Sequence, residues 1–138
     1  MQITKTTFDT TRHHIHLECA IINSEGIKHS FNGILDSGAP RTEFSDLFLM
    51  HTGLLAAPNT QVEIQPRLQS QKYGKVSLPL IEICSQQLIE FDVYVATFES
   101  SWGIDALIGL DFFRRFQLTI DYADGVIITR PYSNKLTS

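Results

Sequence analysis

Short runs in which apolar and polar residues alternate, or in which a few apolar residues follow one another, cover most of the chain. The first long run, 14–22, is followed by the turn-forming residues 23–26, and 28–35 forms a returning run. Such runs, bounded by turn residues, are typical of β-strands, so we predict a β-hairpin here. The returning strand ends at Asp36-Ser37-Gly38-Ala39-Pro40, because glycine and proline break an extended pattern.

The second half of the chain continues in the same way. Residues 76–83 and 88–96 predict two strands joined by 84–87, and Pro79 inside the first of them indicates a bulge or an edge position. The later predicted elements are a short buried strand at 106–110, a brief helix at 111–116, and a hairpin of 118–122 and 126–129 around Asp124-Gly125.

Two segments fit more than one structure. Residues 42–49 have apolar positions at helical spacing but are few, and the polar stretch 65–75 suits an exposed hairpin tip or loop. Many short strands with one late helix predict an all-β fold, closed and barrel-like, with one short helix near the C-terminus. We expect one domain over residues 1–138, because no repeat or second domain is visible.

Composition fits an ordinary folded protein, with 43% hydrophobic and 19% charged residues and a formal net charge of −4. No cluster of lysine and arginine indicates nucleic-acid binding, and no apolar run predicts a membrane span or a signal peptide. Cys19 and Cys84 lie in strand-like segments without metal-ligand spacing, where small buried thiols are expected. We therefore expect a cytoplasmic protein that binds neither nucleic acid nor membrane.

Asp36-Ser37-Gly38 is the first candidate for chemistry, although these residues alone favour a structural turn. His14 and His16 would share one strand face, but no third ligand is near them, so exposed strand residues are favoured over a metal site. Asp111 fits a helix start, Arg114-Arg115 a solvated helix face, and Trp102 a core or dimer-contact residue. We predict no metal site and no cofactor.

A second motif changes the interpretation of Asp36. About 70 residues later comes Ala106-Leu107-Ile108-Gly109-Leu110-Asp111-Phe112-Phe113, followed by the hairpin around Asp124-Gly125. In this order the two segments resemble the retropepsin-like aspartic proteases, over about residues 14–130. In that family an apolar strand ends in Asp-Thr/Ser-Gly-Ala, and two apolar residues with a glycine, a short helix and a terminal hairpin follow. The resemblance implies a retropepsin-like acid protease fold.

The resemblance also implies roles for single residues. Asp36 would activate the attacking water, Ser37 would bond to the partner's loop, and Gly38 would allow close backbone approach to the carboxylates. Leu107-Ile108-Gly109 would hold the Asp36 loop. The residues expected to contact substrate are Ala39, Ile108 and, on a candidate flap at about 69–75, Tyr73 and Gly74.

The chain has one Asp-Ser-Gly motif, so a second catalytic aspartate would have to come from a second copy in a homodimer. Hydrolysis of an amide by water needs a base for the water and an acid for the carbonyl oxygen. Two adjacent carboxylates can fill both roles, since they share one proton, and a two-fold axis would bring a second Asp36. We therefore predict an aspartic endopeptidase that cleaves peptide or protein substrates.

Two alternatives remain open. Pro40 and a candidate flap with one glycine, Gly74, also fit a weakly active or inactive peptide-binding or dimerisation module. The chain could also be a monomer that dimerises only at high concentration or on a partner.

Overall fold

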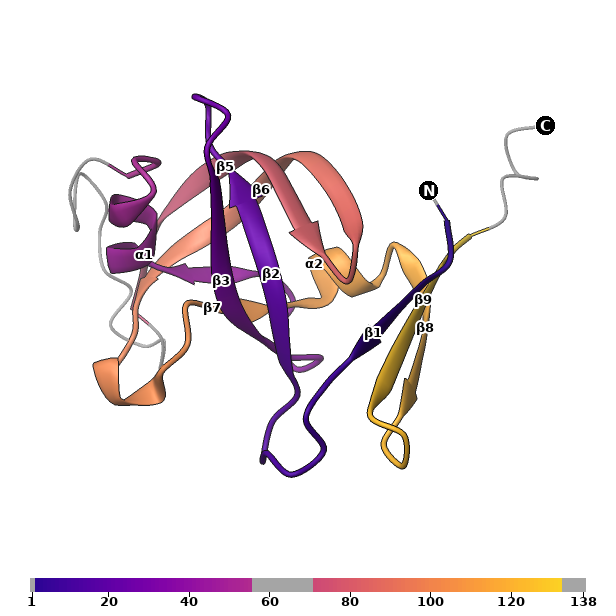
Figure 1. The fold of residues 1–138 in the computed structure, drawn as a ribbon. Helices are drawn as coiled ribbons and strands as arrows, with labels where there is room; N and C mark the ends of the chain where they lie inside the picture. The colour runs from indigo at the N-terminus through magenta and orange to yellow at the C-terminus, as the bar shows by residue number, and fades with distance from the viewer. Residues whose placement is uncertain (1, 56–70, 133–138) are drawn as a thin grey trace.

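The computed structural model describes residues 2–55 and 71–132, which form a closed barrel and a three-stranded sheet beside it (Figure 1). The barrel has the strand order β2-β3-β7-β4-β6-β5, and the smaller sheet has the order β1-β9-β8. The strands are β1 (Thr4–Thr7), β2 (His16–Ile22), β3 (Lys28–Leu35), β4 (Glu43–Ser45), β5 (Gln71–Ile83), β6 (Gln86–Thr97), β7 (Ala106–Ile108), β8 (Phe116–Asp121) and β9 (Val126–Pro131). The predicted all-β, barrel-like fold is thus confirmed.

The hairpin of β2 and β3 lies where the alternation predicts it, with His16 opposite Ile34 and Ile22 opposite Lys28. Asn23 forms its turn, because the side-chain oxygen accepts hydrogen bonds from the backbone N–H groups of Glu25 and Ile27, both at 3.0 Å. This local bonding is why asparagine favours turns. The hairpin fixes the strand that leads to Asp36.

The hairpin of β5 and β6 is longer than predicted. Pairing continues to Ile83 opposite Gln86, so the turn is Cys84-Ser85 alone and not 84–87. Cys84 and Ser85 have φ of 52° and 59°, the geometry of a two-residue turn that matches the twist of the strands. Pro79 interrupts the ladder as expected, since it has no N–H to donate, and neither it nor Glu90 opposite it is paired.

The ambiguous segment 42–49 contains both structures that its pattern allows. It forms β4 and then the helix α1 (Asp46–His51), so a helix is present in addition to the predicted one near the C-terminus. Ser45 caps α1 by accepting a hydrogen bond from the N–H of Phe48 at 3.5 Å. An N-terminal cap satisfies one of the N–H groups that a helix start leaves free.

The C-terminal helix, α2, spans Leu110–Phe113 and is shorter than the predicted 111–116, because Phe116 already begins β8. The predicted hairpin of β8 and β9 is present. The polar N-terminal segment also forms a strand, β1, which pairs with β9 from Thr4 opposite Thr129 to Thr7 opposite Val126. Its threonines show no alternation of apolar and polar residues, which is why the pattern did not predict it.

A small polar cluster joins the three-stranded sheet to the barrel. The Thr4 hydroxyl donates to the carbonyl oxygen of Cys84 at 2.6 Å and bonds to the Thr129 hydroxyl. The Gln86 amide donates to the carbonyl oxygen of Gln2 at 2.7 Å. Because these groups are mostly buried, their hydrogen bonds replace water and hold the sheet at the β5–β6 turn.

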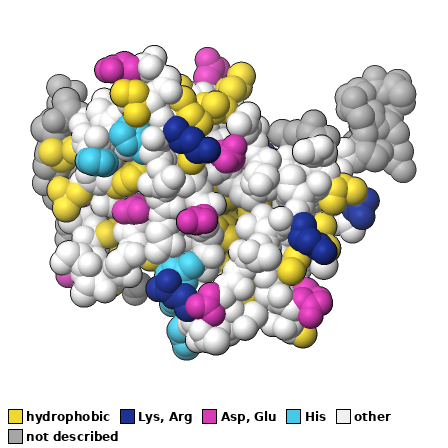
Figure 2. Space-filling view, viewed as in Figure 1, with side chains coloured by type: hydrophobic (Ala, Val, Ile, Leu, Met, Phe, Trp, Pro, Cys, Tyr) yellow, Lys and Arg dark blue, Asp and Glu magenta, His cyan; other side chains and the backbone are white. Residues whose placement is uncertain are grey.

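The surface is mixed in character. Lysine and arginine side chains lie apart from one another on the face shown in Figure 2. Among the described residues, no helix has both the length and the apolar character needed to cross a bilayer.

Burial makes both thiols weak acids. Cys19 and Cys84 are buried and unpaired, and burial raises the pKa of Cys19 far above its usual range and that of Cys84 to about 11. Only the thiolate is nucleophilic, so we expect neither cysteine to react with a maleimide or disulfide reagent at pH 8 in the folded protein. Two thiols should react after unfolding in guanidinium. Fast labelling without denaturant, measured by mass spectrometry, would contradict this burial.

Candidate active site

Asp36 stands at the point where β3 leaves the barrel, and β7 fixes it there. The strands β3 and β7 are parallel, with Ile34 opposite Leu107 and Leu35 opposite Ile108. The Asp36 N–H continues this ladder by donating to the carbonyl oxygen of Ile108 at 2.9 Å. The structure thus brings together the two motifs that are far apart in the sequence.

The loop after Asp36 is tightly turned. The Asp36 carboxylate accepts a hydrogen bond from the Gly38 N–H at 3.0 Å, and the Ala39 N–H donates to the Asp36 carbonyl oxygen at 3.1 Å. A Cβ on Gly38 would lie only 3.3 Å from the carboxylate oxygen. Asp36 is half-buried, whereas Ser37 and Gly38 are exposed. Glycine therefore leaves the carboxylate room and keeps one face of the loop open.

Asp111 braces this loop from behind. Its carboxylate accepts two hydrogen bonds from Thr42, one from the backbone N–H at 2.8 Å and one from the hydroxyl at 2.7 Å. The Thr42 hydroxyl in turn accepts from the Gly109 N–H at 3.0 Å. Thr42 is fully buried, so these bonds have no replacement from water. Asp111 is in the first turn of α2, as predicted, but it also ties α2 to the Asp36 loop.

We expect Asp111→Ala to lower the free energy of unfolding by about 2–4 kcal/mol, because it leaves the N–H and hydroxyl of buried Thr42 without an acceptor. Asp111→Asn is the matched control, since its side-chain oxygen can still accept from the N–H and its amide can donate to the hydroxyl. It should lose about 1 kcal/mol. Urea unfolding measures both changes, and equal losses would rule out the brace.

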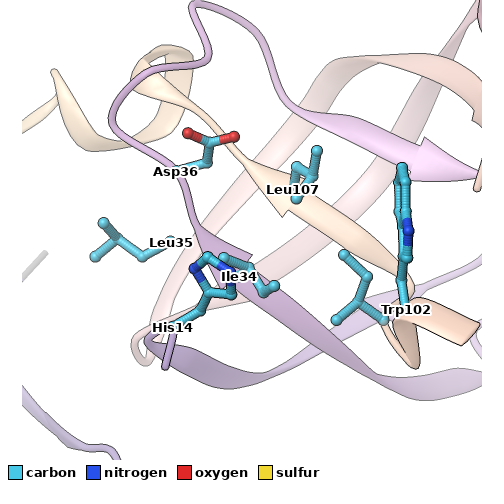
Figure 3. A pocket seen from close by; sticks show the side chains of 7 residues that line it. His14, Ile34, Leu35, Asp36, Trp102 and Leu107 are labelled. Atoms are coloured by element: carbon cyan, nitrogen blue, oxygen red, sulfur yellow. The ribbon is translucent and has the colours of Figure 1, made fainter. Parts of the chain in front are cut away.

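Asp36 opens onto a cavity of about 410 Å³. Figure 3 shows the carboxylate at one end and Trp102 at the other, with Leu107 between them in this view. The cavity is lined by His14, Ile34, Leu35, Asp36, Trp102, Ile104 and Leu107. Five of these seven residues are apolar, and one, Asp36, supplies a carboxylate. This arrangement is suited to an apolar side chain next to a polar reacting group.

Two other residues that were predicted to contact substrate do not line the cavity. Ala39 and Ile108 are buried, and their backbone carbonyl oxygens accept from Leu110 and Asp36. In this structure they support the loop, and Leu107 lines the cavity instead of Ile108.

The candidate flap falls partly within β5. Lys72 pairs with Ala96 and Gly74 with Val95, so the register shifts at Tyr73. The side chain of Tyr73 lies outside the described part of the structure, so its predicted contact with substrate stays a prediction. Gly74 is half-buried, and residues 69–70 of the predicted flap lie outside the described residues.

Sequence reasoning missed two residues of this cavity. Trp102, expected in the core or at a dimer contact, is 48% exposed and borders the cavity, where Phe98 packs against it at 5.5 Å between ring centroids. His14, expected to be an exposed strand residue, precedes β2 and lines the cavity while remaining exposed. An aromatic residue between turn residues, Ser101 and Gly103, was the available signal for Trp102.

The site offers acid–base chemistry by carboxylate and imidazole groups. Asp36 supplies the carboxylate of the cavity and His14 supplies the imidazole. Among the described residues, no three histidine, cysteine, aspartate or glutamate side chains are grouped so that they could hold a metal ion.

This barrel, with its carboxylate loop braced by a parallel strand and a short helix, is the retropepsin-like aspartic protease fold. The chain resembles a retropepsin-like aspartic protease from Rickettsia conorii, with a TM-score of 0.64 and 14% identity over 92% of this chain and 89% of that one. It also resembles the retroviral protease-like domain of Ddi1 from Leishmania major, with a TM-score of 0.57 and 16% identity over 88% and 96%. No protein-family profile and no curated protein matches the sequence.

Proposed function

We propose that the chain is an aspartic endopeptidase that acts as a homodimer, with one Asp36 from each protomer in a shared active site. The observation that carries the proposal is the Asp36 carboxylate, which is half-buried on a loop fixed by β7 and opens onto a cavity lined mainly by apolar residues. The likeness to solved retropepsin-like structures supports it at the level of fold.

The proposed mechanism needs a carboxylate pair. Two Asp36 side chains within hydrogen-bonding reach would share a single proton, because both cannot be ionised so close together. The ionised carboxylate takes a proton from water as it attacks the peptide carbon, and the protonated one donates to the carbonyl oxygen. When the tetrahedral intermediate collapses, the C–N bond breaks and the carboxyl group that took the water proton gives it to the leaving nitrogen. The other carboxylate takes back the proton from the former carbonyl oxygen, which restores the starting pair. No covalent intermediate and no cofactor is required.

The proposed substrate is an extended peptide or protein segment. It would lie between the Asp36 loops and the candidate flap, held by main-chain hydrogen bonds, with alternate side chains entering pockets. The cavity between Ile34, Leu107 and Trp102 would take an apolar side chain next to the scissile bond. Ser37, which is exposed, would bond to the partner protomer's loop.

The test combines proteolysis with assembly. A peptide library is incubated with the purified protein from acidic to neutral pH, with and without pepstatin, and sedimentation is measured over a concentration series. The expected result is pepstatin-sensitive cleavage whose rate per protomer falls when dilution dissociates the dimer. Cleavage that is independent of concentration in a monomer would contradict the shared site. A stable dimer that cleaves nothing would favour the peptide-binding module.

A further inference from the structure

Two basic side chains meet at a second, smaller cavity, to which Asp36 does not contribute. This cavity, of about 30 Å³, is lined by Arg41, Lys75, Asp92, Val93 and Tyr94. Arg41 belongs to the loop that continues from Asp36, and Lys75 lies on β5, at the end of the candidate flap. The cavity is therefore at a place where the loop and the flap strand approach each other.

Backbone contacts fix the loop and the strand that carry the two cations. Tyr94 pairs with Lys75 in the β5–β6 ladder, and its N–H donates to the carbonyl oxygen of Thr42 at 2.9 Å. The Lys75 ammonium lies over the Tyr94 ring, 5.4 Å from its centroid. The Arg41 backbone packs against Gly109, where a Cβ would be 2.9 Å from the Arg41 oxygen. These contacts connect the Lys75 strand to the Arg41 loop through Tyr94 and Thr42.

The charge at this cavity is positive although the whole chain carries −4. Arg41 and Lys75 are exposed, and neither forms an ion pair within the described part of the chain, where Lys28 and Glu82 make one. Of the described residues, Asp92 is the one acid that lines the cavity, so one positive charge is left over. Glu43 neighbours Tyr94 in the β4–β6 ladder but is buried and does not line the cavity.

We propose that Arg41 and Lys75 form a subsite for a carboxylate side chain of the substrate. This inference rests on the proposed function and adds a substrate preference to it. Among residues 2–55 and 71–132, none lines both this cavity and the one at Asp36, so the two cavities are separate. We assign the subsite to a substrate side chain further from the scissile bond than the two that flank it. Glutamate or aspartate is therefore favoured at one such position, and glutamine or lysine is disfavoured.

The test uses a fluorescent peptide library with an apolar centre, in which each outer position is in turn glutamate, glutamine or lysine. At one position, wild-type protein should cleave the glutamate peptide about three- to tenfold better in kcat/KM than the glutamine peptide at low salt. The ratio should shrink as sodium chloride is added. The double variant Arg41→Ala, Lys75→Ala should lose the preference for glutamate. The double variant Arg41→Glu, Lys75→Glu should instead cleave the lysine peptide better than the glutamate peptide.

Lys28→Ala is the matched control, because it removes one exposed positive charge at the far end of β3 and should keep the preference. Thermal unfolding checks that all variants fold. An unchanged glutamate preference in the double alanine variant, or none in the wild type, would overturn the subsite.

A second measurement separates this inference from the proposed protease activity. Fluorescence anisotropy reports binding of the same peptides to Asp36→Asn protein, which needs no cleavage. If wild type cleaves nothing, yet glutamate peptides bind better through Arg41 and Lys75, the subsite stands and the protease proposal fails. If wild type cleaves peptides without any glutamate preference, the protease proposal stands and the subsite fails. Neither cleavage nor binding of any peptide would overturn both.

Discussion

Asp36→Asn should abolish proteolysis, with a loss of roughly 10³-fold or more in kcat/KM, and leave a folded dimer. The amide cannot take a proton from water, so both the base and its acid partner are lost in the symmetric site. The fold should survive, because the side-chain oxygen of asparagine can still accept the hydrogen bond from the Gly38 N–H. We expect the free energy of unfolding to change by less than about 1 kcal/mol. Cleavage assays and urea unfolding measure the two effects.

Mixing experiments extend this prediction to the shared site. If each active site needs two Asp36 carboxylates, a large excess of Asp36→Asn protein should draw wild-type protomers into inactive heterodimers and suppress cleavage. Asp124→Asn is the matched control, because Asp124 is an exposed acid in the β8–β9 turn, where asparagine before glycine is equally suited. It should keep full activity and should not suppress wild type. Activity in Asp36→Asn, or no suppression on mixing, would show that Asp36 is not half of the site.

The sequence predicted those strands in which apolar and polar residues alternate and which are bounded by turn residues. The β2–β3 and β8–β9 hairpins have apolar residues on their buried faces and turn residues such as Asn23 and Gly125 between them. The approach of Asp36 to Ile108 was expected from a resemblance rather than from alternation, and it is present as a hydrogen bond of 2.9 Å. Pairing of residues so far apart depends on chain topology, which no local window contains.

Features that depend on tertiary contact were not predictable from pattern. The strand β1 is polar, and it is held by the partner strand β9 and by buried bonds of Thr4. The role of Asp111 follows from Thr42, a buried polar residue whose burial no sequence window reveals. Trp102 borders the cavity because its turn leads into β7, although a lone tryptophan is more often buried. Each case requires knowledge of what packs against the residue.

Gly109→Ala should strongly destabilise the protein, because the added methyl group would have no room beside the Asp36 loop. A Cβ at Gly109 would lie 2.6 Å from the Ala39 oxygen and 2.8 and 2.9 Å from the Arg41 carbonyl carbon and oxygen. All three are backbone atoms of the Asp36 loop, so the loop itself must move. We expect a loss of about 3 kcal/mol in the free energy of unfolding, as in overpacked cores. The kcat/KM for cleavage should also fall, and by more than the loss of folded protein explains, because the moved loop carries Asp36.

Gly53→Ala distinguishes steric contact from backbone strain. Gly53 has φ of +80°, and a Cβ there would meet no described atom within 4 Å, so alanine should cost only about 1 kcal/mol through its conformation. Gly109 is the reverse case, since its φ of −100° suits any residue and only the contacts oppose alanine. Urea unfolding and cleavage assays on both variants compare the two causes directly. If Gly109→Ala were as stable and active as Gly53→Ala, close packing of Gly109 against the loop could not be what positions the Asp36 carboxylate.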